Sequence, residues 1–160
     1  MAIEDTRTGA RTGLTLLLGY VGTVAGEIGM DRALELDTKL CRQMGAAQGQ
    51  MLKQQVGVDE VDAATASQLV SQALAGGFGI QAETLESTAE RAALQVGECP
   101  VYQAAQAVGM DHEEIQAVCQ AGSLPFMAAM VKQLNPQAVY RLERFRAGPN
   151  GTCQEVIEIA

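Results

Sequence analysis

The chain has 160 residues, 48% of them hydrophobic and 19% charged, which is typical of one soluble globular domain that can bury a core. Its formal net charge is −8, from 19 acidic and 11 basic residues, and this sign repels phosphate backbones and argues against nucleic acid as the main partner. We expect one domain, residues 1–160, with a helical half (1–77) before a cysteine-containing α+β half (78–160).

The first predicted helix spans about Ile3 to Ile28. Its uncharged run, Thr12 to Gly26, is too short and too rich in glycine to span a membrane, and acidic residues near the start argue against a signal peptide. We therefore expect a buried helix. Its glycines share one face, where another helix should approach closely; they are Gly19, Gly22 and Gly26.

Asp31 is a suitable N-cap for a second helix. Apolar side chains then recur at steps of three and four, which predicts one buried stripe made of Leu36, Leu40, Met44, Ala47 and Met51. Cys41 lies beside that stripe and is interpreted as a packing residue.

A third helix is predicted from about Ala63 to Ala75, ended by the glycines of "AGGFG". Two short strands follow, "IQAETLE" and "RAALQVG", around a polar turn. Three more helices are predicted at 101–108, 111–120 and 125–134, with Asp111 as the N-cap of the second.

The C-terminal segments, 139–146 and 152–159, alternate in polarity around the turn formers of "AGPNG" and predict a β-hairpin. In the last strand Cys153, Glu155, Ile157 and Ile159 should share the covered face. The predicted fold class is α+β, with N-terminal helices followed by a small antiparallel sheet backed by helices.

Three cysteines of the C-terminal half are the candidate site residues: Cys99, Cys119 and Cys153. Cys99 lies where a predicted strand passes into a helix, Cys119 on the inner face of a helix, and Cys153 at the start of the last strand. Their spacing is not that of a zinc knuckle. Buried structural thiols, metal ligands and a reactive thiol all remain open.

Other chemistry has less support. His112, the only histidine, is flanked by acidic residues in a first helical turn and is expected to be exposed. No GxSxG, GxGxxG or GxxxxGK[ST] motif occurs, so serine-hydrolase and standard nucleotide sites are not indicated. Glu98 is a candidate ligand or base because Cys99 is its neighbour, although strand alternation would direct the two side chains to opposite faces.

The C-terminal half resembles the L-2-amino-thiazoline-4-carboxylic acid hydrolase-like family. The similarity lies in Cys99–Pro100 before an amphipathic helix and "VGM", in "EEIQAVC" ending at Cys119, in "LNP", and in "AGPNGTC" before an alternating strand. It covers about Phe78 to Ile159. An acidic residue commonly follows the second cysteine in that family, whereas Ala121, Gly122 and Ser123 stand here.

That family also resembles the broader 4-vinyl reductase domain, which includes small-molecule sensor modules of transcription activators. In some of these, cysteines on the sheet hold zinc. The resemblance aligns Cys153 with one such ligand, whereas Phe145 stands where another cysteine would be. Cys119 is a hypothetical replacement for that ligand.

The resemblance implies a cytoplasmic hydrolase-like protein that acts on a small sulfur- or nitrogen-containing metabolite. Cys99, Cys119 and Cys153 would line one pocket, where a thiolate attacks the substrate or the three hold zinc. An iron–sulfur site is the weaker cofactor alternative. The alternative function is a non-catalytic small-molecule-binding or sensor module. The expected partner is a small molecule, with no nucleic acid and no membrane; the substrate and a homo-oligomeric state are left open.

Overall fold

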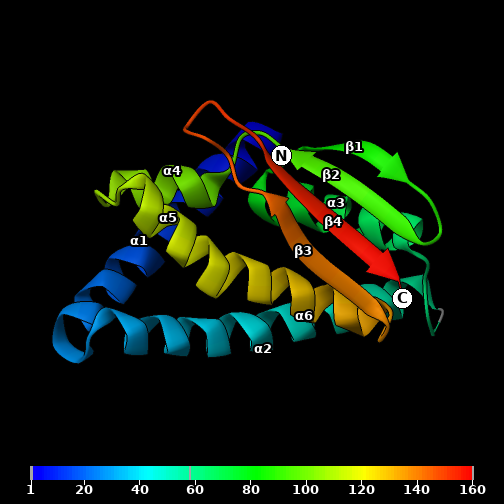
Figure 1. The fold of residues 1–160 in the computed structure, drawn as a ribbon, viewed down its shortest axis with the longest axis horizontal. Coiled ribbons are helices and arrows are strands. Elements are labelled where there is room, and N and C mark those ends of the chain that lie inside the picture. Colours follow the sequence, from blue (N-terminus) through cyan, green and yellow to red (C-terminus); the bar gives the residue numbers. More distant parts are fainter. Residues whose placement is uncertain (1, 58, 160) are drawn as a thin grey trace.

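The computed structural model describes residues 2–57 and 59–159, and its fold is the α+β class that the sequence predicts. Three helices, α1 (Ile3–Ile28), α2 (Met30–Val56) and α3 (Ala63–Phe78), precede the strands β1 (Ala82–Ser87) and β2 (Arg91–Val96). A second helical region and a final hairpin complete the chain, with α4 (Pro100–Ala107), α5 (His112–Val118), η1 (Cys119–Ser123), α6 (Leu124–Leu134), β3 (Ala138–Arg144) and β4 (Cys153–Ile159). Figure 1 shows α2 and α6 side by side, and α3 behind the sheet.

The first helix has the predicted bounds, but it is not the buried helix that we expected. Leu18 and Val21 are its buried residues, whereas Leu16 and Tyr20 are 73% and 68% exposed. The predicted close approach of another helix at its glycines is also absent within the described part of the chain. A Cβ built at Gly19, Gly22 or Gly26 would have no described atom of another element within 4 Å. One narrow face of α1 packs on the rest of the protein. Within residues 2–57 and 59–159, no helix is long and apolar enough to cross a membrane.

The second helix buries a different face from the predicted one. Leu40 and Met44 of the predicted stripe are 43% and 54% exposed, and the other three members are exposed too. The face turned inward instead carries mainly small and polar residues, followed by one leucine near the end of the helix: Ala33, Asp37, Cys41, Gly45, Gly49 and then Leu52. The reason is the partner helix: α2 lies so close to α6 that glycine is required at the contact, and large side chains do not fit between them.

The start of α2 also differs from the prediction. Gly29, with a φ of 87°, is the N-cap residue, and Asp31 lies one step inside the first turn rather than at the cap. A positive φ is a conformation that glycine adopts without steric cost, so Gly29 provides the sharp reversal between α1 and α2. Asp31 keeps a favourable place for a negative charge, near the positive end of the helix dipole.

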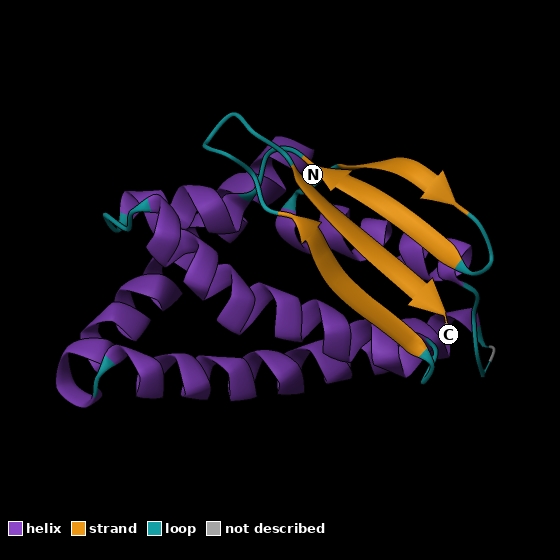
Figure 2. Cartoon of the chain, in the orientation of Figure 1, coloured by secondary structure: helices purple, strands orange, loops and turns teal. Residues whose placement is uncertain are grey.

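The four strands form one antiparallel sheet in the order β1-β2-β4-β3 (Figure 2). The last strand therefore lies between β2 and β3, and it pairs Cys153 with Val96 and Ile157 with Ala92. This central position explains why Cys153 and Ile157 are buried, as predicted for that face. Both predicted hairpins are confirmed within two residues at each end.

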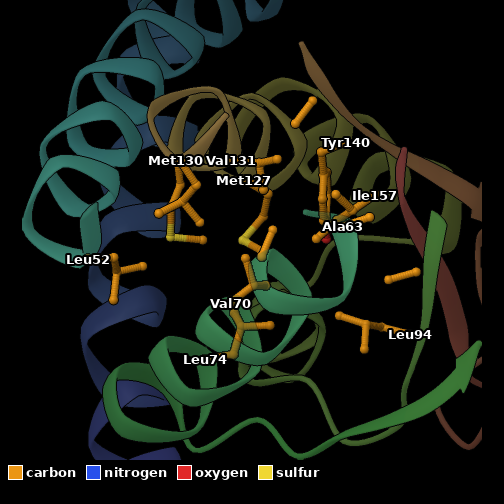
Figure 3. Close-up of a cluster of buried hydrophobic side chains, with 14 of the residues drawn as sticks. Leu52, Ala63, Val70, Leu74, Leu94, Met127, Met130, Val131, Tyr140 and Ile157 are labelled. Carbon is orange, nitrogen blue, oxygen red and sulfur yellow. The ribbon is translucent and has the colours of Figure 1, made fainter. Parts of the chain in front are cut away.

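The core consists of two groups of buried side chains. The larger group fills the space between α3, α6 and the inner face of the sheet, where Val70, Leu94, Met130 and Ile157 meet (Figure 3). The smaller group joins α1, α4 and α5 through Leu18, Tyr102, Ala105, Ile115 and Val118, among others. Cys99 and Phe145 pack against both groups and therefore lie at their boundary.

The helices expected at 111–120 and 125–134 are parts of one continuous helical rod. Asp111 caps α5 as predicted, and its carboxylate forms a capping box with Glu114. The break expected between the two helices is instead a π-helical turn, η1, which leads directly into α6. Such wide turns inside helices are rare and occur frequently at functional sites.

Candidate functional site

A cavity of about 170 Å³ lies between the helices and the inner face of the sheet. Its walls are mainly apolar and include Leu18, Leu74, Val96, Val118, Phe126 and Met127. The polar side chains on the wall come from three regions. Asp37 and Cys41 belong to α2, Cys99 and Ser123 to the N-cap of α4 and the end of η1, and Tyr140 and Glu155 to the sheet. An apolar space with a few polar groups is the usual form of a small-molecule site.

Tyr140 and Glu155 form a hydrogen-bonded pair on the sheet side of the cavity. Tyr140 of β3 lies opposite Ile157 of β4, so Glu155 is its diagonal neighbour, within reach of the phenol ring. The Tyr140 hydroxyl donates a hydrogen bond to the Glu155 carboxylate. Burial raises the pKa of Glu155, while Tyr140 and Arg146 counteract that rise. Burial, with the nearby carboxylate, raises the pKa of Tyr140 well above its usual value.

Asp37 and Cys41 form the polar group on the helical side. Asp37 is only 8% exposed, and its Oδ1 accepts a hydrogen bond from the Cys41 thiol at 3.7 Å. Burial raises the pKa of Asp37, and the Cys41 thiol offsets part of this rise. Burial, followed by the Asp37 charge, raises the pKa of Cys41 to about 12.

The π-helical turn closes over this pair. A Cβ built at Gly122 would lie 2.8 Å from Asp37 Oδ2 and 3.6 Å from Cys41 Sγ, so a glycine is needed where η1 passes the carboxylate. Next to it, Thr38 donates a hydrogen bond of 2.6 Å to the Ala121 carbonyl, which ties α2 to the same turn. The π-helix thus holds Asp37 and Cys41 in place at the wall.

Cys99 occupies the N-cap position of α4, as expected for a residue where a strand passes into a helix. Burial raises the pKa of its thiol, although the backbone N–H groups of Tyr102 and Val101 and the charge of Arg146 act in the opposite direction. Arg146 is itself buried. It donates hydrogen bonds to the carbonyls of Val96 at 3.3 Å and Gly97 at 2.6 Å, and it lies 4.9 Å from the centre of the Tyr102 ring.

Cys119 begins the π-helical turn, and Cys153 is buried at the start of β4. Burial raises the pKa of Cys119 to about 12, with further contributions from the charges of Cys99 and Cys153. Cys153 belongs to the larger core group and Cys119 packs against the smaller one, while Cys99 packs against both. Only Cys99 of these three lies on the cavity wall, which also carries Cys41, a residue that the sequence placed in packing.

The predicted zinc site does not fit the arrangement of these side chains. Among residues 2–57 and 59–159, no three His, Cys, Asp or Glu side chains are placed to hold a metal ion. We therefore derive no chemistry from a metal.

The two remaining sequence candidates lie at the surface. The Glu98 side chain is 68% exposed and pairs with Arg7 of α1; β2 ends at Val96, so the strand alternation expected at Glu98 and Cys99 does not apply. His112 is exposed as predicted, with Nδ1 3.1 Å from the Tyr102 hydroxyl and its ring packed on Phe145. Neither residue lies on the cavity wall.

Comparison with solved structures shows a known fold. The phenol-responsive sensory domain of the transcription activator PoxR, solved with phenol, superimposes with a TM-score of 0.61 over 91% of this chain and 74% of its own length, at 10% sequence identity. A trafficking protein particle complex subunit 3 from Naegleria fowleri, covalently bound to palmitic acid, gives a TM-score of 0.55 over 93% of this chain and 96% of its own, again at 10% identity. The chain shares its fold with both.

The comparisons at sequence level show no family. No family model matches the chain, and no curated protein matches it. The hydrolase family indicated by the cysteine pattern therefore has no support at sequence level. The likeness to sensor modules of transcription activators is supported at the level of fold, by the PoxR domain.

Sequence reasoning missed the residues that define the cavity. Asp37 lies outside the apolar stripe predicted for α2, because each residue turns an α-helix by about 100° and Asp37 follows Leu36 directly. The one available signal was the four-residue spacing of Asp37, Cys41, Gly45 and Gly49, which places polar and small residues on one face. Glu155 was assigned to the covered face of β4, but its pairing with Tyr140 needed the strand register.

Proposed function

We propose that this chain is a small-molecule-binding module whose interior cavity holds one compact, mainly apolar ligand. The observation that carries the proposal is the cavity itself, which is apolar over most of its wall and has polar side chains from three regions of the chain. For comparison, an engineered apolar cavity of about 150 Å³ binds benzene. A volume of about 170 Å³ is thus sufficient for a single ring or a short alkyl chain.

The two solved structures with this fold add support, because each was determined with an apolar or aromatic molecule. One contains phenol and the other contains covalently bound palmitic acid. Neither identity is high enough to transfer a ligand. What they support is that this arrangement of helices and sheet is compatible with binding of an aromatic or long-chain molecule.

The binding-module hypothesis is better supported than the hydrolase hypothesis. A thiolate mechanism requires a lowered thiol pKa, as occurs in activated cysteines. Burial instead raises the pKa of Cys99, and it raises the pKa of both Cys41 and Cys119 to about 12. These thiols are suited to packing and weak hydrogen bonding. Hydrolysis of a thiazoline ring remains a prediction from the cysteine pattern alone.

Binding is tested by titrating the folded protein with phenol, benzyl alcohol and n-hexanol, monitored by amide chemical shifts. We expect saturable shifts for at least one probe, centred on residues of the cavity wall. Val118→Phe and Leu74→Phe place extra volume in the cavity from opposite sides, and each should weaken binding by about ten-fold or more. Val139→Phe makes the same change as the first variant at an exposed site on β3 and should have no effect.

The proposal is wrong if none of the probes gives saturable shifts. It is also wrong if binding persists unchanged in both cavity-filling variants while their thermal unfolding remains cooperative. A binding module further predicts that the bound probe is recovered chemically unchanged.

A further inference from the structure

The two carboxyl groups on the cavity wall, Asp37 and Glu155, differ in how their charge is compensated. Glu155 has the Tyr140 hydroxyl as a donor and the buried Arg146 near enough to stabilise its charge. Asp37 has only the Cys41 thiol, a weak donor. None of the ion pairs that the described residues form includes Asp37.

Asp37 is therefore a buried carboxylate with unused hydrogen-bonding capacity. More than nine-tenths of the residue is buried, and it lies on the cavity wall. Its Oδ1 accepts the thiol, whereas Oδ2 has no hydrogen bond from any described residue and passes close to Gly122. A buried carboxylate is costly unless a charged or hydrogen-bonding partner compensates it.

The basic residues of α2 do not supply that partner. Arg32, Lys39 and Arg42 lie on exposed parts of the helix, and Arg32 is paired with Glu35. Lys53 lies in the last turn, about four turns further along the helix than Asp37. The cavity wall itself includes no lysine, arginine or histidine. A positive charge beside Asp37 would have to arrive with the ligand.

We propose that the ligand is a small apolar primary amine whose ammonium group binds Asp37 while its hydrocarbon part fills the cavity. This inference rests on the proposed binding function and assigns the chemical class of the ligand. The ammonium group has three N–H donors, so one can bond Oδ2 of Asp37 and another can reach a neighbouring acceptor. Charge-assisted hydrogen bonds of this kind are about twice as strong as neutral ones.

Charge also discriminates against other ligand classes. A carboxylate ligand would meet the carboxyl groups of Asp37 and Glu155 and a protein whose formal net charge is −8. The same net charge attracts cations toward the surface. A neutral alcohol of equal shape would fill the cavity, but its hydroxyl would donate only a neutral hydrogen bond to Asp37.

The test compares three ligands of one shape with the folded protein at neutral pH: benzylamine, benzyl alcohol and benzoate. We expect benzylamine to bind at least about ten-fold more tightly than benzyl alcohol by calorimetry or chemical-shift titration, and benzoate to bind most weakly. Asp37→Asn should remove the preference for the amine and retain binding of the alcohol. Asp31→Asn, the same change at an exposed position of α2, should leave the preference intact.

Each outcome decides between the two proposals. If benzyl alcohol binds and benzylamine is not preferred, the amine inference is wrong and the binding function stands. If no ligand binds, the binding function itself fails. If Glu155→Gln rather than Asp37→Asn removes the preference, the assignment of the ammonium group to Asp37 is wrong. The comparison on the unaltered protein decides the ligand class even if a variant fails to fold.

Discussion

Gly45 of α2 lies directly against the backbone of Phe126 in α6. A Cβ built at Gly45 would be 2.8 Å from the carbonyl carbon of Phe126 and closer still to its oxygen. One turn later, a Cβ at Gly49 would be 2.8 Å from the Cβ of Gln133. The two helices are therefore in backbone contact, which brings Asp37 and Cys41 of the same helix face to the cavity.

Gly45→Ala should destabilise the protein by about 1–3 kcal/mol, because the added methyl group would force α2 away from α6. Gly13→Ala is the matched control, at an exposed position of α1 where a Cβ meets no described atom. It should stabilise the protein by about 0.5–1 kcal/mol through helix propensity. Urea unfolding measures both changes, and equal behaviour of the two variants would contradict the close helix contact.

Asp37 should make stability depend on pH in a specific direction. Its folded pKa is raised above the ordinary value of 3.8 by burial, so its favourable contribution is complete below the unfolded pKa and is lost as pH rises through the folded pKa. Asp37→Asn does not titrate. The free energy of unfolding of this variant, relative to the unaltered protein, should therefore increase between acid and neutral pH.

Denaturant unfolding at several pH values measures that difference. Asp31→Asn, an exposed change in the same helix, provides the baseline and should vary much less with pH. A stability difference that falls on going to neutral pH would mean that the Asp37 carboxylate is stabilised in the folded protein, contrary to its burial.

Arg146 should be important for stability because it joins two separate segments. Its guanidinium group ties the end of β2 to the connection between β3 and β4 through the carbonyls of Val96 and Gly97. Arg146→Met should cost about 1.5–3 kcal/mol, the usual contribution of hydrogen bonds to a charged group. Arg144→Met, the same change at an exposed position two residues earlier, should cost far less in thermal or urea unfolding. Equal losses would show that the buried contacts are not important.

The thiols should react slowly in the folded protein. A pKa of about 12 at Cys41 and Cys119, against an ordinary 9.0, leaves about 1,000-fold less thiolate near neutral pH. Iodoacetamide labelling followed by peptide mass spectrometry should show both thiols modified at least about 100-fold more slowly in the native state than in urea. Rapid labelling of one native thiol would instead favour the reactive-thiol hypothesis.

The sequence was sufficient for most of the elements and their order. Capping by Asp111 and the alternating C-terminal hairpin act over a few residues, so local pattern predicts them well. The end of α3 is three residues later than the predicted Ala75, because the helix continues through Gly76 and Gly77 and only Gly79 takes the left-handed C-cap position. The buried face of α2 could not be predicted in the same way. The spacing of apolar residues predicts that the stripe containing Leu40 and Met44 is buried. The face that is buried instead depends on the close approach of α6, which the local sequence of α2 does not indicate.

The candidate site was predicted only in part. The cysteine pattern includes Cys99, which lies on the cavity wall, whereas the catalytic or metal-binding role of the three thiols stays a prediction from the sequence. The roles of Asp37 and Tyr140 depend on contacts between segments far apart in the sequence. Asp37 of α2 lies against Gly122 of η1, and the strand register brings Tyr140 beside Glu155.

The π-helical turn at Cys119–Ser123 also determines the rotational phase of the helical rod. Each residue of an α-helix turns the chain by about 100°, so the one extra residue in a wide turn shifts every later side chain around the axis by that angle. Before the turn Ile115 and Val118 face the smaller core, and after it Met127 and Met130 face the larger one. Deleting a single residue from the turn would therefore rotate α6 away from the sheet and break the continuity between the two cores.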